Sequence, residues 1–507
     1  MRQRTALRLY ALHSWTGVVL GLLVFVLCFS GSVALFYDEL HQWEHPEHRT
    51  ALDENDYDVD GIVRHALASH PAAKPSAIYL TLPVEAKPLL DIRFYETGAD
   101  QRRKLVRLHY DVTTGRELQI HGENLGRFLR NLHTDLHLPN PIGRYLAGLL
   151  GIVMLLSIVS GVILHRKILA NLFVFRVHRS TQLKWSDAHN VIGTWGLPFH
   201  IMIAFTGALL GLSTLLLSVL ALFNFQGDVQ AARQLLAGTP PRAVGHAVPM
   251  TNLDSILDDA RARRGSRLEY ATILNWGDEN AYISVQARAD DSLDASPEHR
   301  YWLRDGSWDE TWSLGRSVGG RMYAAITPLH YATYGGLSLK ILYAFLGFAA
   351  SALVVTGIRV WTQRRASRLP EHARSPHRLL LKATGGISAG MVLATLCAFY
   401  ANKILPTEGE QVFAIGAVYF LGWLAALVCC LVSTDVGRGV RLVLGTSALL
   451  AMGAPAVNAL TTGQGLFIRT ASTNWWVDGA DLALLVVGLG LLLGLYCSRL
   501  PNSPPEC

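Results

Sequence analysis

Two histidines recur with the same neighbours in the two halves of this chain. His13 is followed one helical turn later by Gly17, and His189 is followed by Gly193 at the same distance. A neutral imidazole is a strong ligand for iron, and a glycine beside it leaves room for a flat cofactor. The repeat therefore indicates two matched positions that could hold a planar metal-containing group.

A second pair of histidines follows the same repeat. Leu132-His133 precedes an apolar stretch that ends in Ser-Gly-Val, and Leu329-His330 precedes one that ends in Thr-Gly-Ile. We expect the four histidines at the starts of four membrane-spanning helices. A histidine in that place also suits the lipid interface, but ionisable side chains in spanning helices usually face the bundle interior and act there. Four histidines at repeat-related positions favour the interpretation that they are metal ligands.

The composition is that of a multi-pass membrane protein. Half of the 507 residues are hydrophobic and only 17% are charged. A helix needs about 20 apolar residues to cross the bilayer core. Eight runs meet that length, and the first is expected to remain as an anchor: 15–37, 142–164, 191–223, 338–361, 379–400, 411–433, 440–460 and 480–499.

Basic residues cluster before the first run and in every second connection after it, which predicts that both termini lie in the cytoplasm. The net charge of +6 follows from this topology, and no nucleic-acid partner is expected. Five of the six cysteines lie in apolar runs and the sixth lies in the C-terminal tail, so the sequence offers no disulfide framework.

The polar segments between the spans are long enough to fold. We expect an all-α polytopic bundle of about eight transmembrane helices with two small extracytoplasmic α+β domains. Each outer domain is predicted to begin with a helix, at Val59–Ser69 and Leu253–Ala262, followed by strands at 77–82, 89–95 and 104–110 in the first and at 269–274 and 281–286 in the second. The predicted parts are 1–37 (first span), 38–128 (first outer domain), 129–223 (spans two and three), 224–328 (second outer domain), 329–365 (fourth span) and 366–507 (a block of four spans).

Several motifs carry a family resemblance. They are LHSWTGVVLG at 12–21, DVTTG at 111–115, LHTDLH before GRYLAGLLG at 143–151, DAHNVIGTWGLPF at 187–199 and LHYATYGG at 329–336. Over roughly residues 7–365 the chain resembles the PepSY-associated transmembrane family, and the outer domains would then be PepSY-like. That family includes inner-membrane ferrisiderophore reductases, which carry haem between their helices. The resemblance implies electron transfer, and the last four spans lie outside it.

The topology pairs the histidines by depth. His13 and His189 begin helices at the cytoplasmic side, and His133 and His330 begin helices at the outer side, so each pair could hold the iron of one haem b. The chain has no CxxCH sequence for covalent haem attachment. Three other histidines, His200, His165 and His137, compete as ligands or could replace one of the four. Gly17 and Gly193 are weaker members of the site.

We expect an oxidoreductase that passes electrons to a ferric siderophore or another periplasmic acceptor, with no side chain acting as acid, base or nucleophile. The chain has no dinucleotide fingerprint, P-loop or HExxH helix. The donor is therefore external, a quinol or a cytoplasmic reductase. Two alternatives remain open: a cofactor-free sensor or scaffold, which would be colourless, and a metal or siderophore transporter that uses the histidines as a path.

Overall fold

The computed structural model describes most of the chain. The described residues are 3–46, 57–71, 76–84, 87–97, 103–118, 125–165, 168, 173, 176, 180–237, 241–264, 267–288, 298–312, 322, 324–405, 411–466, 468 and 475–498. They form two compact units, a helical one made of Met1–Glu44, Gly122–Leu212 and Lys340–Cys507, and a second one made of His45–His121 and Ser213–Leu339. Each unit is described by itself.

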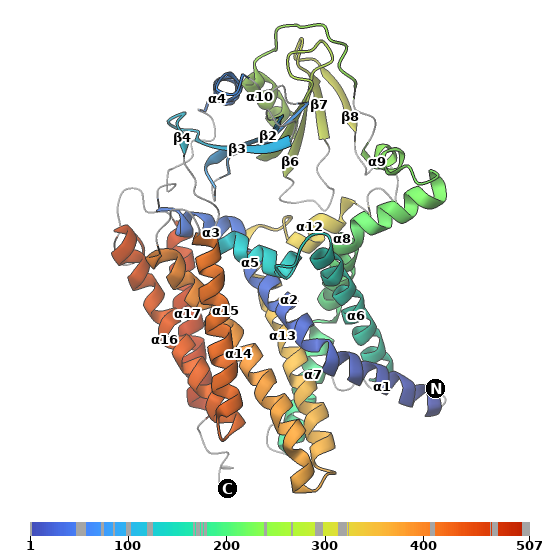
Figure 1. Ribbon diagram of the computed structural model, residues 1–507, viewed down its shortest axis with the longest axis vertical. Coiled ribbons are helices and arrows are strands. Elements are labelled where there is room, and N and C mark those ends of the chain that lie inside the picture. The colour runs from blue at the N-terminus through green and yellow to red at the C-terminus, as the bar shows by residue number, and fades with distance from the viewer. Residues whose placement is uncertain are drawn as a thin grey trace. The chain divides into compact units, whose positions relative to one another are not determined.

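The helical unit is a multi-pass membrane bundle, as predicted. Among the described residues, seven helices are long and apolar enough to cross a bilayer, or eight if a bent pair at the N-terminus counts as one span. The helices, shown in Figure 1, are α1 (Gln3–Val19), α2 (Gly21–Ala34), α3 (Tyr37–Glu44), α5 (Leu125–Thr134), α6 (Ile142–Leu164), α7 (Thr181–Trp195), α8 (Leu197–Asn224), α13 (Gly336–Ala366), α14 (Ser375–Ile404), α15 (Gln411–Val432), α16 (Val436–Thr462) and α17 (Trp475–Cys497). Helix α8 enters the second unit at Ser213, and α13 leaves it at Lys340.

The first expected span is not one continuous helix. Helices α1 and α2 meet at Leu20 with a bend of 62°. The third expected span is also broken, at Gly196 between α7 and α8. Glycine is a poor helix former, and Gly17 and Gly21 flank the first break. The two breaks lie at equivalent places in the repeat, so in both halves of the chain the helix that carries the proposed ligand ends shortly after it.

The expectation that the four histidines begin helices is wrong. His13 lies in the second half of α1 and His189 in the second half of α7. His133 lies in the last turn of α5, a short amphipathic helix that ends before α6 begins, and His330 lies at the end of the short α12 (Ile326–Tyr331). The apolar runs located the spans, but these short helices carry too few apolar residues to be distinguished from loops by hydropathy.

The two outer segments form one sheet and not two separate domains. Among the described residues, eight antiparallel strands follow the order β4-β3-β2-β1-β5-β6-β7-β8, and β1 of the first segment pairs with β5 of the second, with Ile78 opposite Ile273. The pairing removes two strand edges that separate domains would expose. The strands are β1 (Ala77–Thr81), β2 (Leu89–Thr97), β3 (Arg103–Asp111), β4 (Glu117–Leu118), β5 (Arg267–Leu274), β6 (Tyr282–Arg288), β7 (Glu298–Trp302) and β8 (Trp308–Trp312).

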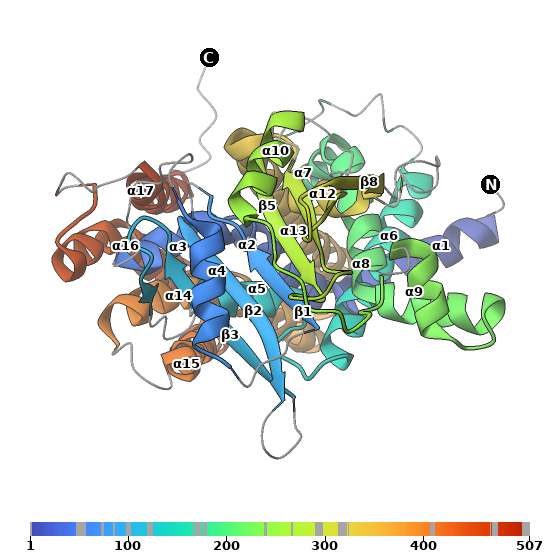
Figure 2. The same cartoon turned by 90° about the horizontal axis from the view of Figure 1, so that it is seen from above.

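Two helices cover one face of this sheet. Figure 2 shows α4 (Val59–Ala68) and α10 (Leu253–Arg264) lying across the strands. Their apolar sides, including Val63 and Leu257, pack against inward-facing strand residues such as Leu80 and Ile283. The helices and the first strands of each half were predicted from the sequence, whereas β4, β7 and β8 were not. The unit also contains α9 (Val229–Ala237) and α12.

The last four helices are attached to the N-terminal part of the helical unit. Residues of α2 and α5, including Phe25 and Phe128, share one apolar core with residues of α14, α15, α16 and α17. The Trp43 indole on α3 donates to Asp481 on α17 at 2.8 Å. These contacts fix α3 against the C-terminal block, which the sequence showed only as a stretch without histidine.

Candidate functional site

A cavity of about 510 Å³ lies inside the helical unit, lined by residues of α1, α2, α6, α7, α8 and α13. Its volume lies in the usual range of about 300–1,000 Å³ for cofactor sites. Four of the predicted site histidines line it: His13, His165, His189 and His200. Gly17 and Gly193 line it as well, so the sequence repeat maps onto one cavity.

His13 reaches from α1 to α6. Its Nδ1 lies 2.9 Å from the backbone carbonyl of Ser157 and 3.2 Å from the Ser160 hydroxyl. A carbonyl only accepts, so Nδ1 carries the proton and Nε2 keeps its lone pair. The Ser160 hydroxyl donates to the Leu156 carbonyl at 2.7 Å, which leaves its oxygen able to accept from the imidazole.

His189 repeats this arrangement from α7 to α13. Its Nδ1 lies 3.1 Å from the Leu353 carbonyl and 3.1 Å from the Thr356 hydroxyl. The Thr356 hydroxyl in turn donates to Ala352 at 2.9 Å. Both imidazoles are therefore held in one tautomer by the same pair of acceptors, which is how proteins usually orient a metal-binding histidine.

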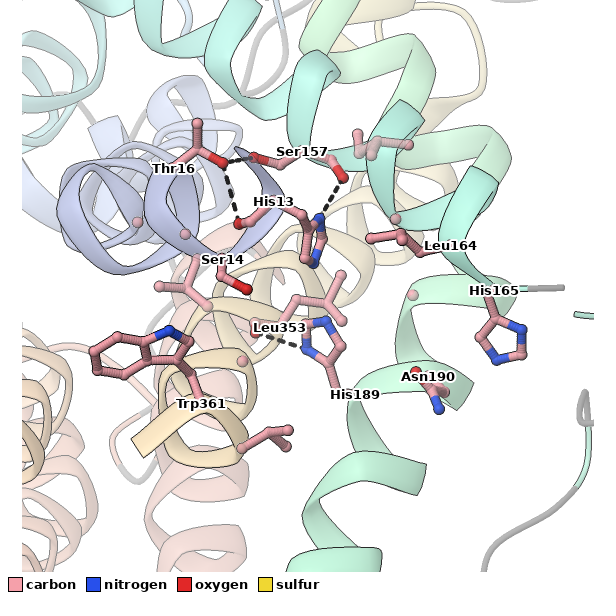
Figure 3. Close-up of a pocket in the computed structure, with 18 of the residues that line it drawn as sticks. His13, Ser14, Thr16, Ser157, Leu164, His165, His189, Asn190, Leu353 and Trp361 are labelled. Carbon is pink, nitrogen blue, oxygen red and sulfur yellow. Dashed lines mark hydrogen bonds between the residues drawn. The ribbon is translucent and has the colours of Figure 1, made fainter. Parts of the chain in front are cut away.

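The two imidazoles face each other across the cavity. Their ring centroids are 6.3 Å apart and their planes are inclined by 75°. In Figure 3 the ring nitrogens that make no bond to the helices point toward one another. A metal lies about 2 Å from an imidazole nitrogen that binds it, and that nitrogen lies about 1.1 Å from the centre of its ring. Two imidazoles that share one metal therefore have ring centres about 6.2 Å apart. The observed spacing fits one metal between His13 and His189.

Glycines allow both the close ring contacts and the open space. A Cβ at Gly161 or at Gly357 would stand 3.1 Å from Cε1 of His13 or of His189, so each ring lies directly on the facing helix. A Cβ at Gly17 would meet nothing within 4 Å, and one at Gly193 would meet only the Leu353 side chain at 3.5 Å. The free space beside each imidazole suits a flat macrocycle.

The described residues contain no group of three or more His, Cys, Asp or Glu side chains that could hold a bare metal ion. A haem brings four nitrogen ligands of its own and takes one or two more from the protein. The donor set of two facing imidazoles therefore fits a haem, as do the open cavity and its glycines.

Two further histidines line the same cavity. His200 on α8 is 1% exposed, and its Nε2 is buried without a hydrogen-bond partner among the described residues. His165 follows α6, and its Nδ1 is likewise buried and unpaired there. Buried polar atoms are nearly always satisfied, so both are places where a cofactor could add a partner. Neither belongs to the facing pair.

The outer candidates are divided between the two units. His133 donates from Nδ1 to the Leu27 carbonyl on α2 at 2.9 Å, and a Cβ at Gly31 would stand 2.7 Å from its ring. His330 belongs to the second unit, so its pairing with His133 stays a prediction. His137 stacks on Phe128 with ring centroids 4.4 Å apart.

The sequence contains a signal for the positions on the facing helices that hold these imidazoles. Three imidazoles each donate a hydrogen bond to a backbone carbonyl of a facing helix and lie against the glycine one turn further along that helix. The pairs of carbonyl and glycine are Ser157 and Gly161 for His13, Leu353 and Gly357 for His189, and Leu27 and Gly31 for His133. Each of those glycines follows a serine or threonine. The repeated Ser-Gly and Thr-Gly pairs therefore mark the seats of three imidazoles, each seat being the backbone carbonyl and the glycine that one histidine contacts.

The chain is similar to known proteins over most of its length. A family model described as the PepSY-associated TM region matches residues 10–364. The chain is also 30% identical over 392 residues to an uncharacterized protein of Pseudomonas aeruginosa, an alignment that covers 74% of this chain and 96% of that protein. The family match includes every residue that lines the cavity and ends before α14.

Proposed function

This chain belongs to the PepSY-associated TM region family, and we propose that it is a di-haem b-type electron-transfer protein of the bacterial inner membrane. It would act as an oxidoreductase that reduces a ferric siderophore, or another periplasmic ferric acceptor, and so releases Fe(II). Both termini lie in the cytoplasm in this proposal. The observation that supports it most is the pair of imidazoles 6.3 Å apart with their lone-pair nitrogens facing each other.

His13 and His189 would hold one haem near the cytoplasmic side. When bound, the haem supplies a carrier for one electron at a time. The chain's own part is to fix both imidazoles through the Ser157 and Leu353 carbonyls and to exclude water with apolar helices. No acid or base is required, because the reaction moves an electron and not a proton.

His133 and His330 would hold a second haem near the outer side. This pairing follows from the sequence repeat and from the Leu27 seat of His133, which matches the seats of the inner pair. Two carriers at different depths divide a path across about 30 Å of hydrocarbon into two shorter steps.

The acceptor gains one electron, so Fe(III) in the chelate becomes Fe(II). Hard oxygen ligands bind Fe(III) more strongly than Fe(II), and the reduced chelate therefore releases its metal. The electron comes from a quinol or a cytoplasmic reductase, which is oxidised by the same number of electrons.

The visible spectrum of the purified, detergent-solubilised chain tests the proposal. We expect a Soret band, sharp α and β bands after reduction, and two haems per chain in a haem assay. His13→Ala and His189→Ala should each remove the same one of the two haems, because either loss breaks the same site. His133→Ala and His330→Ala should each remove the other.

His246→Ala is the matched control, because its imidazole is 77% exposed on the second unit and should leave both haems in place. A colourless wild-type protein would reject electron transfer and favour the sensor or scaffold. Four small, unpaired losses of haem would reject the assignment of the pairs.

A further inference from the structure

One face of the eight-stranded sheet is free of the helices α4 and α10. Side chains alternate between the two faces of a strand. Ile78, Ile92 and Leu108 point into the core beneath the helices, so their neighbours in sequence point to the opposite face. On β1, β2 and β3 the opposite face carries Tyr79, Arg93, Tyr95, Arg103 and Arg107, which we name the arginine–tyrosine face.

Like charges lie side by side on this face. Arg93 of β2 stands directly opposite Arg107 of β3, and Arg103 lies further along the same side of β3. Like charges at opposed positions destabilise a sheet. Among the described residues, no carboxylate forms an ion pair with any of the three arginines, and Arg93 Nε is buried without a hydrogen-bond partner.

The acidic side chain of Asp91, on the same face, is already paired. Asp91 accepts hydrogen bonds from Lys87 at 2.8 Å and from His109 at 2.6 Å. Its charge is therefore compensated locally, and the three arginines keep an excess of positive charge. Guanidinium groups present several donors in a plane that matches carboxylate and similar oxygen pairs.

Tyrosines complete the surface. Tyr79 is 40% exposed and Tyr95 is 44% exposed, and the Arg103 guanidinium lies over the Tyr95 ring at 5.3 Å. Aromatic rings beside arginine are typical of binding surfaces, because they supply apolar contact area without adding a charge. A ligand for this face would carry negative oxygens together with flat or apolar parts.

We propose that the arginine–tyrosine face binds the ferric acceptor as an anionic chelate, with Arg93 and Arg107 contacting its oxygens. The inference rests on the proposed function and adds the charge class of the substrate. A ferric complex of a polycarboxylate has both the negative charge and the oxygen surface that these residues recognise. An uncharged chelate of similar size would lack the negative charge and bind less tightly.

Binding is measured separately from electron transfer by using gallium. Ga(III) has a charge and size close to those of Fe(III) but is not reduced under these conditions. The full, detergent-solubilised chain is dialysed to equilibrium against Ga(III) citrate and, in parallel, against an uncharged Ga(III) trihydroxamate. We expect the wild type to prefer the citrate complex, and Arg93→Gln with Arg107→Gln to raise the Kd for citrate at least about tenfold while leaving the trihydroxamate unchanged.

Lys104→Gln is the matched control, since it removes one positive charge from the same strand on the other face, where Lys104 stands opposite Glu96. Arg93→Lys with Arg107→Lys keeps the charge and should lose less affinity than the glutamine pair. Unchanged citrate binding in the glutamine pair would overturn the inference, as would an equal loss for both chelates. Haem content is measured on the same samples, so a protein that binds citrate but no haem would refute the proposed function alone.

Discussion

Asp60 and Asp254 each accept a hydrogen bond from the first turn of the other's helix. Asp254, the second residue of α10, accepts from the backbone N–H groups of Val59 and Asp60 on α4 at 2.9 and 3.1 Å. Asp60, the second residue of α4, accepts from the Leu253 N–H at 3.1 Å. The helix of each outer segment therefore has backbone N–H groups of its first turn capped by an aspartate of the other segment. Neither outer segment alone contains all the groups that this unit needs.

Replacing Asp254 by alanine should destabilise the outer unit. Loss of an acceptor at a helix N-terminus costs about 0.5–2 kcal/mol, and Asp254 serves two N–H groups. Thermal unfolding followed by tryptophan fluorescence would measure the change. Asp258→Ala is the control: its carboxylate is 71% exposed and pairs along α10 with Arg261 at 2.6 Å, so it should change stability little. Equal losses in the two variants would contradict the reciprocal capping.

Removing the hydroxyl groups near the two imidazoles should raise the reduction potential of the proposed inner haem. Ser160 and Thr356 each provide a second acceptor for an Nδ1 proton, which makes the imidazole a stronger donor and favours Fe(III). A neutral hydrogen bond is worth about 0.5–1.5 kcal/mol, or about 20–60 mV for one electron. Potentiometric titration of Ser160→Ala and Thr356→Val should show shifts of this size in the positive direction.

Ser157→Ala is the control for that titration. Its hydroxyl bonds Thr16 at 3.1 Å, while its backbone carbonyl, which the alanine keeps, holds His13. The potential of this variant should stay close to that of the wild type. A shift as large as that of Ser160→Ala would show that the hydroxyl at position 160 has no special influence on the ligand.

The stability of the outer unit should depend on pH through Asp91. Burial opposes ionisation of this carboxyl, but the hydrogen bond from His109 and the charge of Lys87 outweigh it, so the pKa of Asp91 lies below its usual value. A lowered pKa in the folded state means that the stabilisation is complete above the unfolded value of about 3.9 and is lost as the pH falls through the folded pKa. The free energies of unfolding of the wild type and of Asp91→Asn, measured from pH 7 down to pH 2, should become equal at the acid end. A constant difference across that range would contradict the assignment.

The buried carboxylate of Asp481 should be essential for the C-terminal block. It is 0% exposed and accepts from Trp43, from Asn458 at 3.2 Å and from the Leu466 N–H at 3.2 Å. Asp481→Ala would leave these donors buried without an acceptor, at a cost of about 3 kcal/mol or more. Protection of α3 from proteolysis in detergent should fall. Trp43→Phe removes a single donor and should cost less, and a greater loss in that variant would contradict the central place of Asp481.

The sequence by itself determined the spans, the repeat and the residues that the proposed site uses. The length of the apolar runs locates the membrane helices. A helix satisfies its backbone hydrogen bonds within itself, and a non-helical segment exposed to hydrocarbon would leave them unmade. The alternation of side chains gave β1, β2, β3, β5 and β6 close to their observed bounds. The family resemblance is confirmed, while the haem ligands inferred from the histidines stay a prediction.

The tertiary structure decided what local patterns leave open. No periodicity states that β1 will pair with β5, since any free strand edge satisfies a local rule, and only the packed unit joins the two outer segments into one sheet. The seats at Ser157 and Leu353 likewise depend on a facing helix. Residues more than 140 positions apart in the chain meet there, and their approach is set by packing and hydrogen-bond satisfaction across the whole unit.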